Sequence, residues 1–347
     1  MLLPNPELSE SKVRDLVQAG LKVAAVVPCY NVVRHLGPVV AGMPDYVERI
    51  YLVNDGSSDG TGELIQELCG GRVEAIHLER NMGVGAAVMA GFERAVEEGA
   101  EIVVKMDGDG QMDPLYLPLL IQSLAEGRAD YTKGNRFVRR GYLAEMPLIR
   151  KIGNAGLSFL ARIASGYWNV FDPANGYLAM RREVFLALDR KLVHQRFFFE
   201  TSLLIALSLL KAVVLDVPMA ARYRGETSSL SSWRVAREFP PLLLAGFLRR
   251  IWTIKIVLSL TLEAVFGFFG LVLVLYGGIF GALKYYHYVF VAQAPTPAGT
   301  VMVAALPIII GFQLLIAAVV LDIVSAPTRP VCGPWQGPRE AGDSKNG

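Results

Sequence analysis

The sequence contains few cysteines and almost no net charge. Its 347 residues include three cysteines, and the formal net charge is +2 at pH 7. Cys29, Cys69 and Cys332 lie far apart without metal-site spacing, and their number is odd. A disulfide framework is therefore excluded, and a reducing compartment is indicated. The net charge is too small to indicate nucleic acid as a partner.

Charged residues of either sign are also scarce. Only 19% of the residues are charged and 52% are hydrophobic, which is more apolar than a typical soluble domain. Two long stretches hold a single charged residue each: Val257 to Leu283 contains Glu263, and Val301 to Val324 contains Asp322. Each stretch can cross a bilayer core of about 30 Å, so the sequence predicts two transmembrane helices.

The charges around these stretches predict their orientation. Basic residues precede the first stretch and follow the second, whereas only Lys284 lies between them, so both chain ends are expected in the cytoplasm. Met1 to Gly20 shows no basic segment followed by an apolar one, so we expect no signal peptide. Trp233 to Lys255 mixes basic and aromatic residues, which favours a membrane-surface helix over an ordinary surface helix. Glu263 indicates either a partner or a subunit interface, or a position shallow enough to reach water.

From Leu21 to Pro218, strand-like and helix-like segments alternate. This alternation predicts a mostly parallel sheet covered by helices, and such sheets bind ligands outside the carboxyl ends of their strands. Past Asp130 the pattern is irregular, apart from one further helix and one last strand. The expected strands are Val23 to Val27, Arg49 to Val53, Val73 to Leu78, Ile102 to Met106 and Val213 to Val217. The expected helices are Val33 to Met43, Gly62 to Leu68, Gly85 to Glu98 and Thr201 to Leu210.

Polar residues follow each of the first four strands. Because the carboxyl ends of parallel strands meet at one edge of the sheet, these clusters are expected to converge on a single site. Four such clusters are harder to explain as unrelated turns than any one of them. They are Pro28-Cys29-Tyr30-Asn31, Asn54-Asp55-Gly56, Arg80-Asn81-Met82-Gly83 and Asp107-Gly108-Asp109.

The stretch from Lys105 to Pro114 has two interpretations. Asp107 and Asp109 are two residues apart after a strand, so both carboxylates can reach one hard cation such as Mg²⁺ or Mn²⁺. The same residues are common in ordinary polar turns. Asp113 fits a cap ahead of Pro114 and the following helix better than a place in the cation site.

Taken in order, these motifs resemble the family 2 glycosyltransferases of GT-A fold. Within that family the chain is similar to the branch of dolichyl-phosphate mannosyltransferases and polyprenyl-phosphate glycosyltransferases, whose members often carry two C-terminal membrane spans. The resemblance covers roughly residues 20 to 325. It implies a hexosyltransferase that moves a sugar from GDP-mannose or a UDP-hexose to a polyprenyl phosphate with inversion.

The resemblance also implies roles for individual residues. Asp107, Asp109 and Gln111 match the ligands of a Mg²⁺ or Mn²⁺ ion on the diphosphate, and Asp109 is grouped with the catalytic residues. Asp172 matches an aspartate that faces the reaction centre, as a base or as an orienting group, although Asp also favours turns. Pro28, Tyr30, Asn31, Asp55, Asn81 and Asp107 match positions that hold the nucleotide sugar. Arg136, Arg150, Asn154 and either Arg222 or Arg224 match positions near the acceptor phosphate.

The chain departs from the family pattern in three places. Val32 stands where many relatives have Glu, Asn54 replaces the first Asp of a pair, and Ser229 stands where relatives carry Lys. Glu200 is a weaker candidate, since a nearby acid lies close to the site in the family, but it also suits a helix N-terminus. Cys29 fits a small packed residue better than a nucleophile.

These features predict an α/β GT-A domain attached to the cytoplasmic face of the inner (plasma) membrane by a two-helix hairpin. The expected parts are an N-terminal segment (1–20), the GT-A domain (21–230), a juxtamembrane amphipathic segment (231–256), the hairpin (257–324) and a disordered tail (325–347). Copies could associate through the membrane helices. The alternatives are a glycan or glycerolipid acceptor, or a non-catalytic membrane protein that binds nucleotide sugar.

Overall fold

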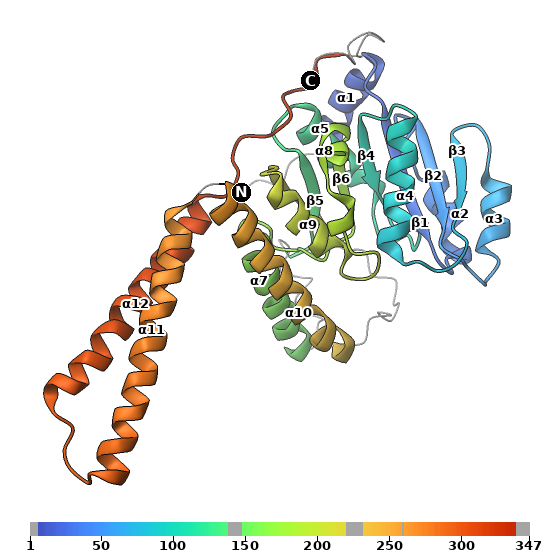
Figure 1. The fold of residues 1–347 in the computed structure, drawn as a ribbon. Coiled ribbons are helices and arrows are strands. Elements are labelled where there is room, and N and C mark those ends of the chain that lie inside the picture. Colours follow the sequence, from blue (N-terminus) through green and yellow to red (C-terminus); the bar gives the residue numbers. More distant parts are fainter. Residues whose placement is uncertain (1–5, 138–147, 220–231, 259, 338–347) are drawn as a thin grey trace. The chain divides into compact units, whose positions relative to one another are not determined.

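The computed structural model describes residues 6–137, 148–219, 232–258 and 260–337 (Figure 1). The chain forms two compact units. The larger unit combines the chain up to Gly246 with the segment from Pro327 onward, and the smaller unit runs from Phe247 to Ala326.

A seven-stranded sheet lies at the centre of the larger unit, in the order β3-β2-β1-β4-β6-β5-β7. All neighbouring strands are parallel except β6, which runs antiparallel to β4 and β5. The expectation of a mostly parallel sheet is therefore confirmed. The strands are β1 (Val23–Cys29), β2 (Arg49–Asn54), β3 (Val73–His77), β4 (Ile102–Lys105), β5 (Tyr131–Asn135), β6 (Leu178–Arg181) and β7 (Val214–Pro218).

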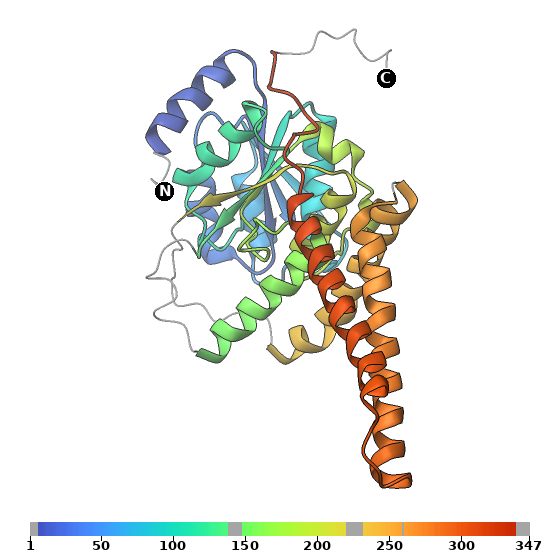
Figure 2. The ribbon, with the colours of Figure 1, turned by 90° about the vertical axis from the view of Figure 1, so that its left-hand side faces the viewer.

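Helices cover both faces of the sheet, as Figures 1 and 2 show. Alternate residues of β1 point to opposite faces: Val23, Ala25 and Val27 join one buried cluster, whereas Ala24 and Val26 join the other. The first cluster is completed by α1 (Pro6–Gln18), α2 (Val33–Ala41), α3 (Thr61–Leu68) and α5 (Leu117–Ala125). The second is completed by α4 (Val84–Glu97), α8 (Arg182–Ala187) and α9 (Phe199–Leu209).

Two strands and one long helix were not predicted from the irregular part of the sequence. β5 and β6 are short, and β5 has the polar sequence Tyr-Thr-Lys-Gly-Asn, yet all five of its residues are buried. Lys133 is tolerated there because its ammonium donates to the Pro173 carbonyl at 2.7 Å. The helix is α7 (Leu148–Ser165).

Part of the C-terminal tail packs on the larger unit, which corrects the expectation that this stretch is disordered. We call residues 331–335 the C-terminal strap. The Val331 and Cys332 N–H groups donate to the buried Asp130 carboxylate, both at 2.9 Å, and a third N–H, from Val213, donates at 2.7 Å. Trp335 donates its backbone N–H to the Ala125 carbonyl at 2.8 Å and its indole N–H to Glu101 at 2.9 Å. These donors satisfy a buried carboxylate, so the strap is part of this unit's fold.

The smaller unit is built on two long apolar helices, α11 (Leu262–Tyr286) and α12 (Ala298–Val324). By length and composition, the segments Leu262–Val291 and Ala298–Val324 can each cross a membrane. The helices pack closely at small residues: a Cβ on Gly270 would lie 2.9 Å from the Gly311 carbonyl oxygen, and one on Gly277 would lie 2.6 Å from that of Ala304.

Ion pairs join the segments at one end of these helices. Lys255 lies 3.1 Å from Glu263 and 3.4 Å from Asp322, and Arg250 lies 2.8 Å from Asp322. Glu263 thus has a charged partner within its own chain, which is the first alternative that the sequence left open. Ahead of these helices, α10 (Ser232–Arg250) continues into a π-helical segment (Ile251–Leu258).

Candidate active site

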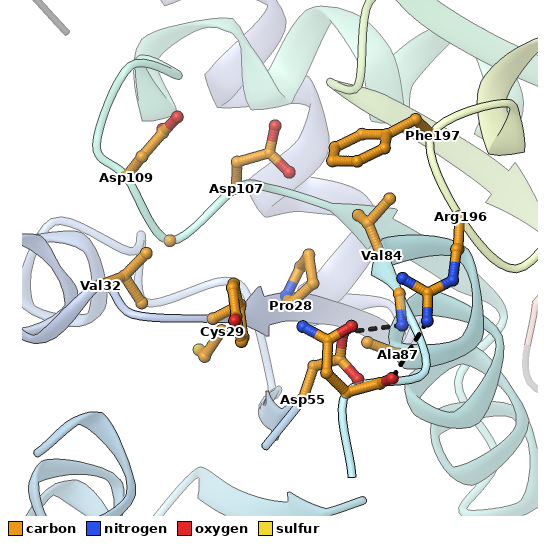
Figure 3. A pocket seen from close by; sticks show the side chains of 14 residues that line it. Pro28, Cys29, Val32, Asp55, Val84, Ala87, Asp107, Asp109, Arg196 and Phe197 are labelled. Atoms are coloured by element: carbon orange, nitrogen blue, oxygen red, sulfur yellow. Dashed lines mark hydrogen bonds between the residues drawn. The ribbon is translucent and has the colours of Figure 1, made fainter. Parts of the chain in front are cut away.

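A cavity of about 460 Å³ opens at the carboxyl ends of β1, β2 and β4 (Figure 3). Its size is within the range of small-molecule sites, and its place at the strand ends is where an open α/β sheet binds ligands. The polar strand-end clusters converge here, as the sequence predicted. The lining residues are Pro28, Cys29, Tyr30, Val32, Asp55, Asn81, Gly83, Val84, Ala87, Asp107, Gly108, Asp109, Arg196 and Phe197.

Asp55 is held by the loop that precedes α4. Its carboxylate accepts hydrogen bonds from the backbone N–H groups of Met82 at 2.6 Å and Gly83 at 2.9 Å, and the residue is only 3% exposed. Gly83 has a φ of +101° and a Cβ there would lie 2.6 Å from the Gln195 carbonyl oxygen, so this position requires glycine. The carboxylate is therefore fixed at the cavity wall (Figure 3).

Asp107 and Asp109 project from the turn after β4, on either side of Gly108 (Figure 3). A Cβ on Gly108 would lie 3.2 Å from a Val32 methyl carbon and 3.3 Å from the Pro28 carbonyl oxygen, so the turn lies close against the end of β1. Asp109 accepts the backbone N–H of Gln111 at 3.0 Å. The two carboxylates thus reach the cavity from a turn with little freedom to move.

This turn suits a divalent cation, although it does not form a complete metal site by itself. Among the described residues, no group of three or more His, Cys, Asp or Glu side chains could hold a metal ion. Two carboxylates that line one cavity are nevertheless the hard oxygen ligands that Mg²⁺ and Mn²⁺ prefer, and such ions commonly complete their shell with substrate phosphates and water. The donor set therefore fits a cation that binds together with a diphosphate.

A buried lysine lies behind this turn. The Lys105 ammonium is 2.7 Å from an Asp107 carboxylate oxygen and 3.3 Å from Glu200, and its side chain is 1% exposed. Burial would lower the pKa of Lys105, but the carboxylates of Asp107 and Glu200 raise it above its ordinary value. Glu200 therefore shares the Lys105 ammonium with Asp107.

Arg136, which the resemblance placed near the acceptor phosphate, and Asp172, which it placed at the reaction centre, bind each other. The Arg136 guanidinium donates to both Asp172 carboxylate oxygens, at 2.7 and 3.1 Å, and the Asn175 amide donates to one of them at 3.3 Å. The Asp172 side chain is 2% exposed, whereas that of Arg136 is 32% exposed. Such a bidentate pair fixes the plane of the guanidinium.

Two further titratable groups lie near this pair and were not predicted from the sequence. Burial lowers the pKa of Lys133 to about 8 and raises the pKa of Asp216 to about 6. One Asp216 oxygen accepts from the Asn135 amide at 2.9 Å and from the Phe171 backbone N–H at 2.8 Å, whereas the other has no hydrogen-bond partner among the residues that the structure describes. Lys133 and Asp216 lie opposite each other in the adjacent strands β5 and β7, so the attraction between their charges opposes both shifts and burial outweighs it.

The remaining predicted residues are placed as follows. Pro28, Tyr30, Asp55, Asn81, Asp107 and Asp109 line the cavity, whereas Asn31 and Gln111 are not among its lining residues. Arg150 and Asn154 fall on α7, but their side chains lie outside what the structure describes, and Arg222 and Arg224 lie outside the described residues. Asp113 caps the helical turn Pro114–Tyr116 by accepting the Leu115 N–H, as expected.

Arg196 and Phe197 line the cavity but were not predicted. They come from the segment before α9, which packs against the start of α4: a Cβ on Gly85 would lie 2.3 Å from the His194 carbonyl oxygen. The Arg196 guanidinium donates to the Asn81 carbonyl at 3.4 Å (Figure 3). Gly83 and Gly85 were the sequence features that could have indicated this contact, because glycine permits another segment to approach closely.

Known proteins resemble this chain in sequence. Residues 24–188 match the family model described as glycosyl transferase family 2. The UDP-N-acetylglucosamine–dolichyl-phosphate N-acetylglucosaminyltransferase of Methanococcus voltae is 30% identical over 213 residues, covering 57% of this chain and 84% of that protein. The polyprenol monophosphomannose synthase of Mycolicibacterium smegmatis is 32% identical over 181 residues, covering 50% and 67%.

A solved structure also resembles the fold. It is the glucosyl-3-phosphoglycerate synthase of Mycobacterium tuberculosis in complex with Mn²⁺, uridine diphosphate and phosphoglyceric acid. The TM-score is 0.52 at 20% identity, and the match covers 72% of this chain and 83% of that one. This likeness concerns the arrangement of helices and strands.

Proposed function

Because the chain belongs to glycosyl transferase family 2, we propose that it transfers a hexose from a nucleotide sugar to a polyprenyl phosphate. The observation that carries this proposal is the cavity at the strand ends, with Asp55 fixed on one wall and the Asp107-Gly108-Asp109 turn on another. The names of the relatives, which act on dolichyl or polyprenol phosphates, support the class of acceptor.

The donor binds along this cavity. The strand-end residues Pro28, Tyr30, Asp55 and Asn81 contact the base and ribose, which leaves the diphosphate beside Asp107 and Asp109. These two aspartates would hold Mg²⁺ or Mn²⁺, and the bound ion would neutralise the charge of the diphosphate leaving group. The donor is a GDP- or UDP-linked hexose.

The acceptor phosphate binds beside Arg136, whose guanidinium suits a phosphate because it offers parallel N–H donors. Asp172 already accepts two of these donors, so it acts by orienting Arg136. A phosphate oxygen is anionic near neutral pH and attacks the anomeric carbon directly. The bond to the nucleoside diphosphate breaks on the opposite side, so the configuration inverts.

The helices α11 and α12 anchor the enzyme in the plasma membrane. In cells with two membranes, this is the inner one. The larger unit contains chain from both sides of this hairpin, up to Gly246 and from Pro327 onward. Both ends of the hairpin are therefore expected on one side of the membrane, which is the cytoplasmic side by the distribution of basic residues.

The test is product formation by the purified full chain in detergent. It is incubated with Mg²⁺, labelled nucleotide sugars and undecaprenyl or dolichyl phosphate. We expect a lipid-linked sugar from one donor, and a loss of at least about 100-fold in Asp109→Ala, because electrostatic stabilisation of the leaving group is a large part of such catalysis.

Asp113→Ala is the matched control, since this carboxylate lies in the same stretch but caps a helical turn. We expect it to keep activity within about twofold and to lose roughly 1 kcal/mol of stability. Competition with glycan or glycerolipid acceptors tests the acceptor class. If no donor gives a lipid-linked product, or if Asp109→Ala equals the wild type, the proposal is wrong.

A further inference from the structure

The buried ammonium group of Lys105 is shared between two carboxylates beside the cavity. The Lys105 ammonium, at the end of β4, contacts Asp107 at 2.7 Å and Glu200 at 3.3 Å. Glu200 lies in the first turn of α9, and its side chain is 13% exposed. The cavity turn and α9 are therefore joined through one ammonium that water barely reaches.

The packing around this ammonium leaves space for both carboxylates. A Cβ on Gly176 would lie 2.2 Å from the Lys105 nitrogen, 3.0 Å from the second Asp107 oxygen and 3.3 Å from Glu200. All three charged groups thus converge on a position without a side chain. Gly176 precedes β6, whose first residue, Leu178, pairs with Lys105 in the sheet.

The charges in this cluster do not balance, because two carboxylates face one ammonium. A buried charge that loses its partner is strongly destabilised. If Lys105 had Asp107 as its sole partner, any turn of Asp107 toward a cation in the cavity would strand the ammonium. Glu200 provides a second carboxylate for the Lys105 ammonium. It also adds one negative charge near the divalent cation.

We propose that Glu200 is a positioning residue of the donor site: it holds the Lys105 ammonium, so that Asp107 is free to bind a divalent cation. This inference rests on the proposed cation-dependent transfer. Glu200 is not among the residues that line the cavity, and it acts through Lys105.

The alternative is an ion pair that only stabilises the fold, and the two roles predict different results for Glu200→Gln. A structural role predicts a lower melting temperature without metal. The proposed role predicts no such loss, because Lys105 and Asp107 remain as a neutral pair. It predicts instead weaker Mn²⁺ binding, since Lys105 then holds Asp107 alone and one negative charge is gone.

The experiment measures Mn²⁺ binding to the purified full chain by electron paramagnetic resonance in the presence of UDP or GDP, which supplies the diphosphate, and melting temperature in EDTA. We expect Glu200→Gln to weaken Mn²⁺ binding about tenfold and to melt within about 2 °C of the wild type or above it. Glu183→Gln is the matched control: Glu183 also lies 3.3 Å from its basic partner, Arg181, and does not line the cavity. It should bind Mn²⁺ like the wild type.

The outcomes separate this inference from the proposed function. If the wild type binds Mn²⁺ and Asp109→Ala does not, but Glu200→Gln binds like the wild type, the positioning role is wrong and the cation site stands. A melting temperature that falls together with Mn²⁺ affinity also overturns the positioning role. If the wild type binds no more Mn²⁺ than Asp109→Ala, both the cation site and this inference are wrong.

Discussion

At the scale of single residues, Arg136 and Asp172 form an ion pair although they lie 36 positions apart in the chain. The family resemblance implied a place near the acceptor phosphate for Arg136 and one at the reaction centre for Asp172, but nothing in their spacing indicated that they bind each other. Lys133 and Asp216 were not predicted at all, because their burial depends on the order of strands in the sheet. Asp107 and Asp109 could be proposed as site residues because both belong to one short Asp-Gly-Asp motif after a strand.

Asp216→Asn is expected to remove a pH-dependent loss of stability. Burial raises the pKa of the Asp216 carboxyl to about 6, whereas an aspartate in an unfolded chain has a pKa near 3.9. Between these values the folded protein holds a proton that the unfolded chain has released. The stabilisation is therefore complete below about pH 4 and is lost as pH rises through about 6, by roughly 1–3 kcal/mol.

Melting temperatures of the wild type and the variant, measured from pH 4 to 7, check this expectation. The asparagine oxygen can still accept from Asn135 and Phe171, so the fold should be retained. Asp189→Asn serves as the control, because Asp189 only caps a short 3₁₀ helix (Arg190–Leu192). Equal pH slopes in Asp216→Asn and the wild type would contradict the account.

At the scale of elements, periodicity and turn residues were sufficient for the first half of the sheet. β1 to β4 are short apolar runs that end in polar clusters, and they lie where the sequence placed them. β5 and β6 lack such patterns, since Lys133 interrupts one and the other has four residues. The strap was missed because its contacts are backbone N–H groups, which any residue except proline provides.

Removing the strap is expected to destabilise the larger unit. A chain that ends at Pro330 loses two of the three N–H donors to the buried Asp130 carboxylate. The loss should cost roughly 3–5 kcal/mol and lower the melting temperature by several degrees. A chain that ends at Gly337 retains the strap and should melt like the wild type. Equal melting of the two truncated chains would show that the strap contributes nothing.

At the scale of the whole molecule, the larger unit contains chain from both sides of the apolar hairpin that α11 and α12 form. Composition predicted two spans, and loop charges predicted their orientation. The return of the chain to the larger unit supports the prediction that both ends of the hairpin lie on one side of a membrane. The positions of lysine and arginine predict that this side is cytoplasmic.

This topology predicts which positions a membrane-impermeant maleimide can reach in intact cells. Ala294→Cys lies in the exposed segment between the two spans and should be labelled from outside. Lys12→Cys, on a helix of the larger unit with a side chain 62% exposed, should be labelled only after permeabilisation. Both are made with Cys69→Ser, because Cys29 and Cys332 are already buried. Labelling of Lys12→Cys in intact cells would show that the orientation is opposite to the predicted one.

The strap also sets an order of events during protein synthesis. Val331 follows Asp130 by 201 residues, which a ribosome adds in about 10–40 s. During that interval both apolar helices are synthesised, while Asp130 still lacks the backbone donors of Val331 and Cys332. The larger unit is thus completed by residues 331–335, after both apolar helices have been synthesised. A nascent chain that stalls before the second helix therefore carries an unfinished enzyme.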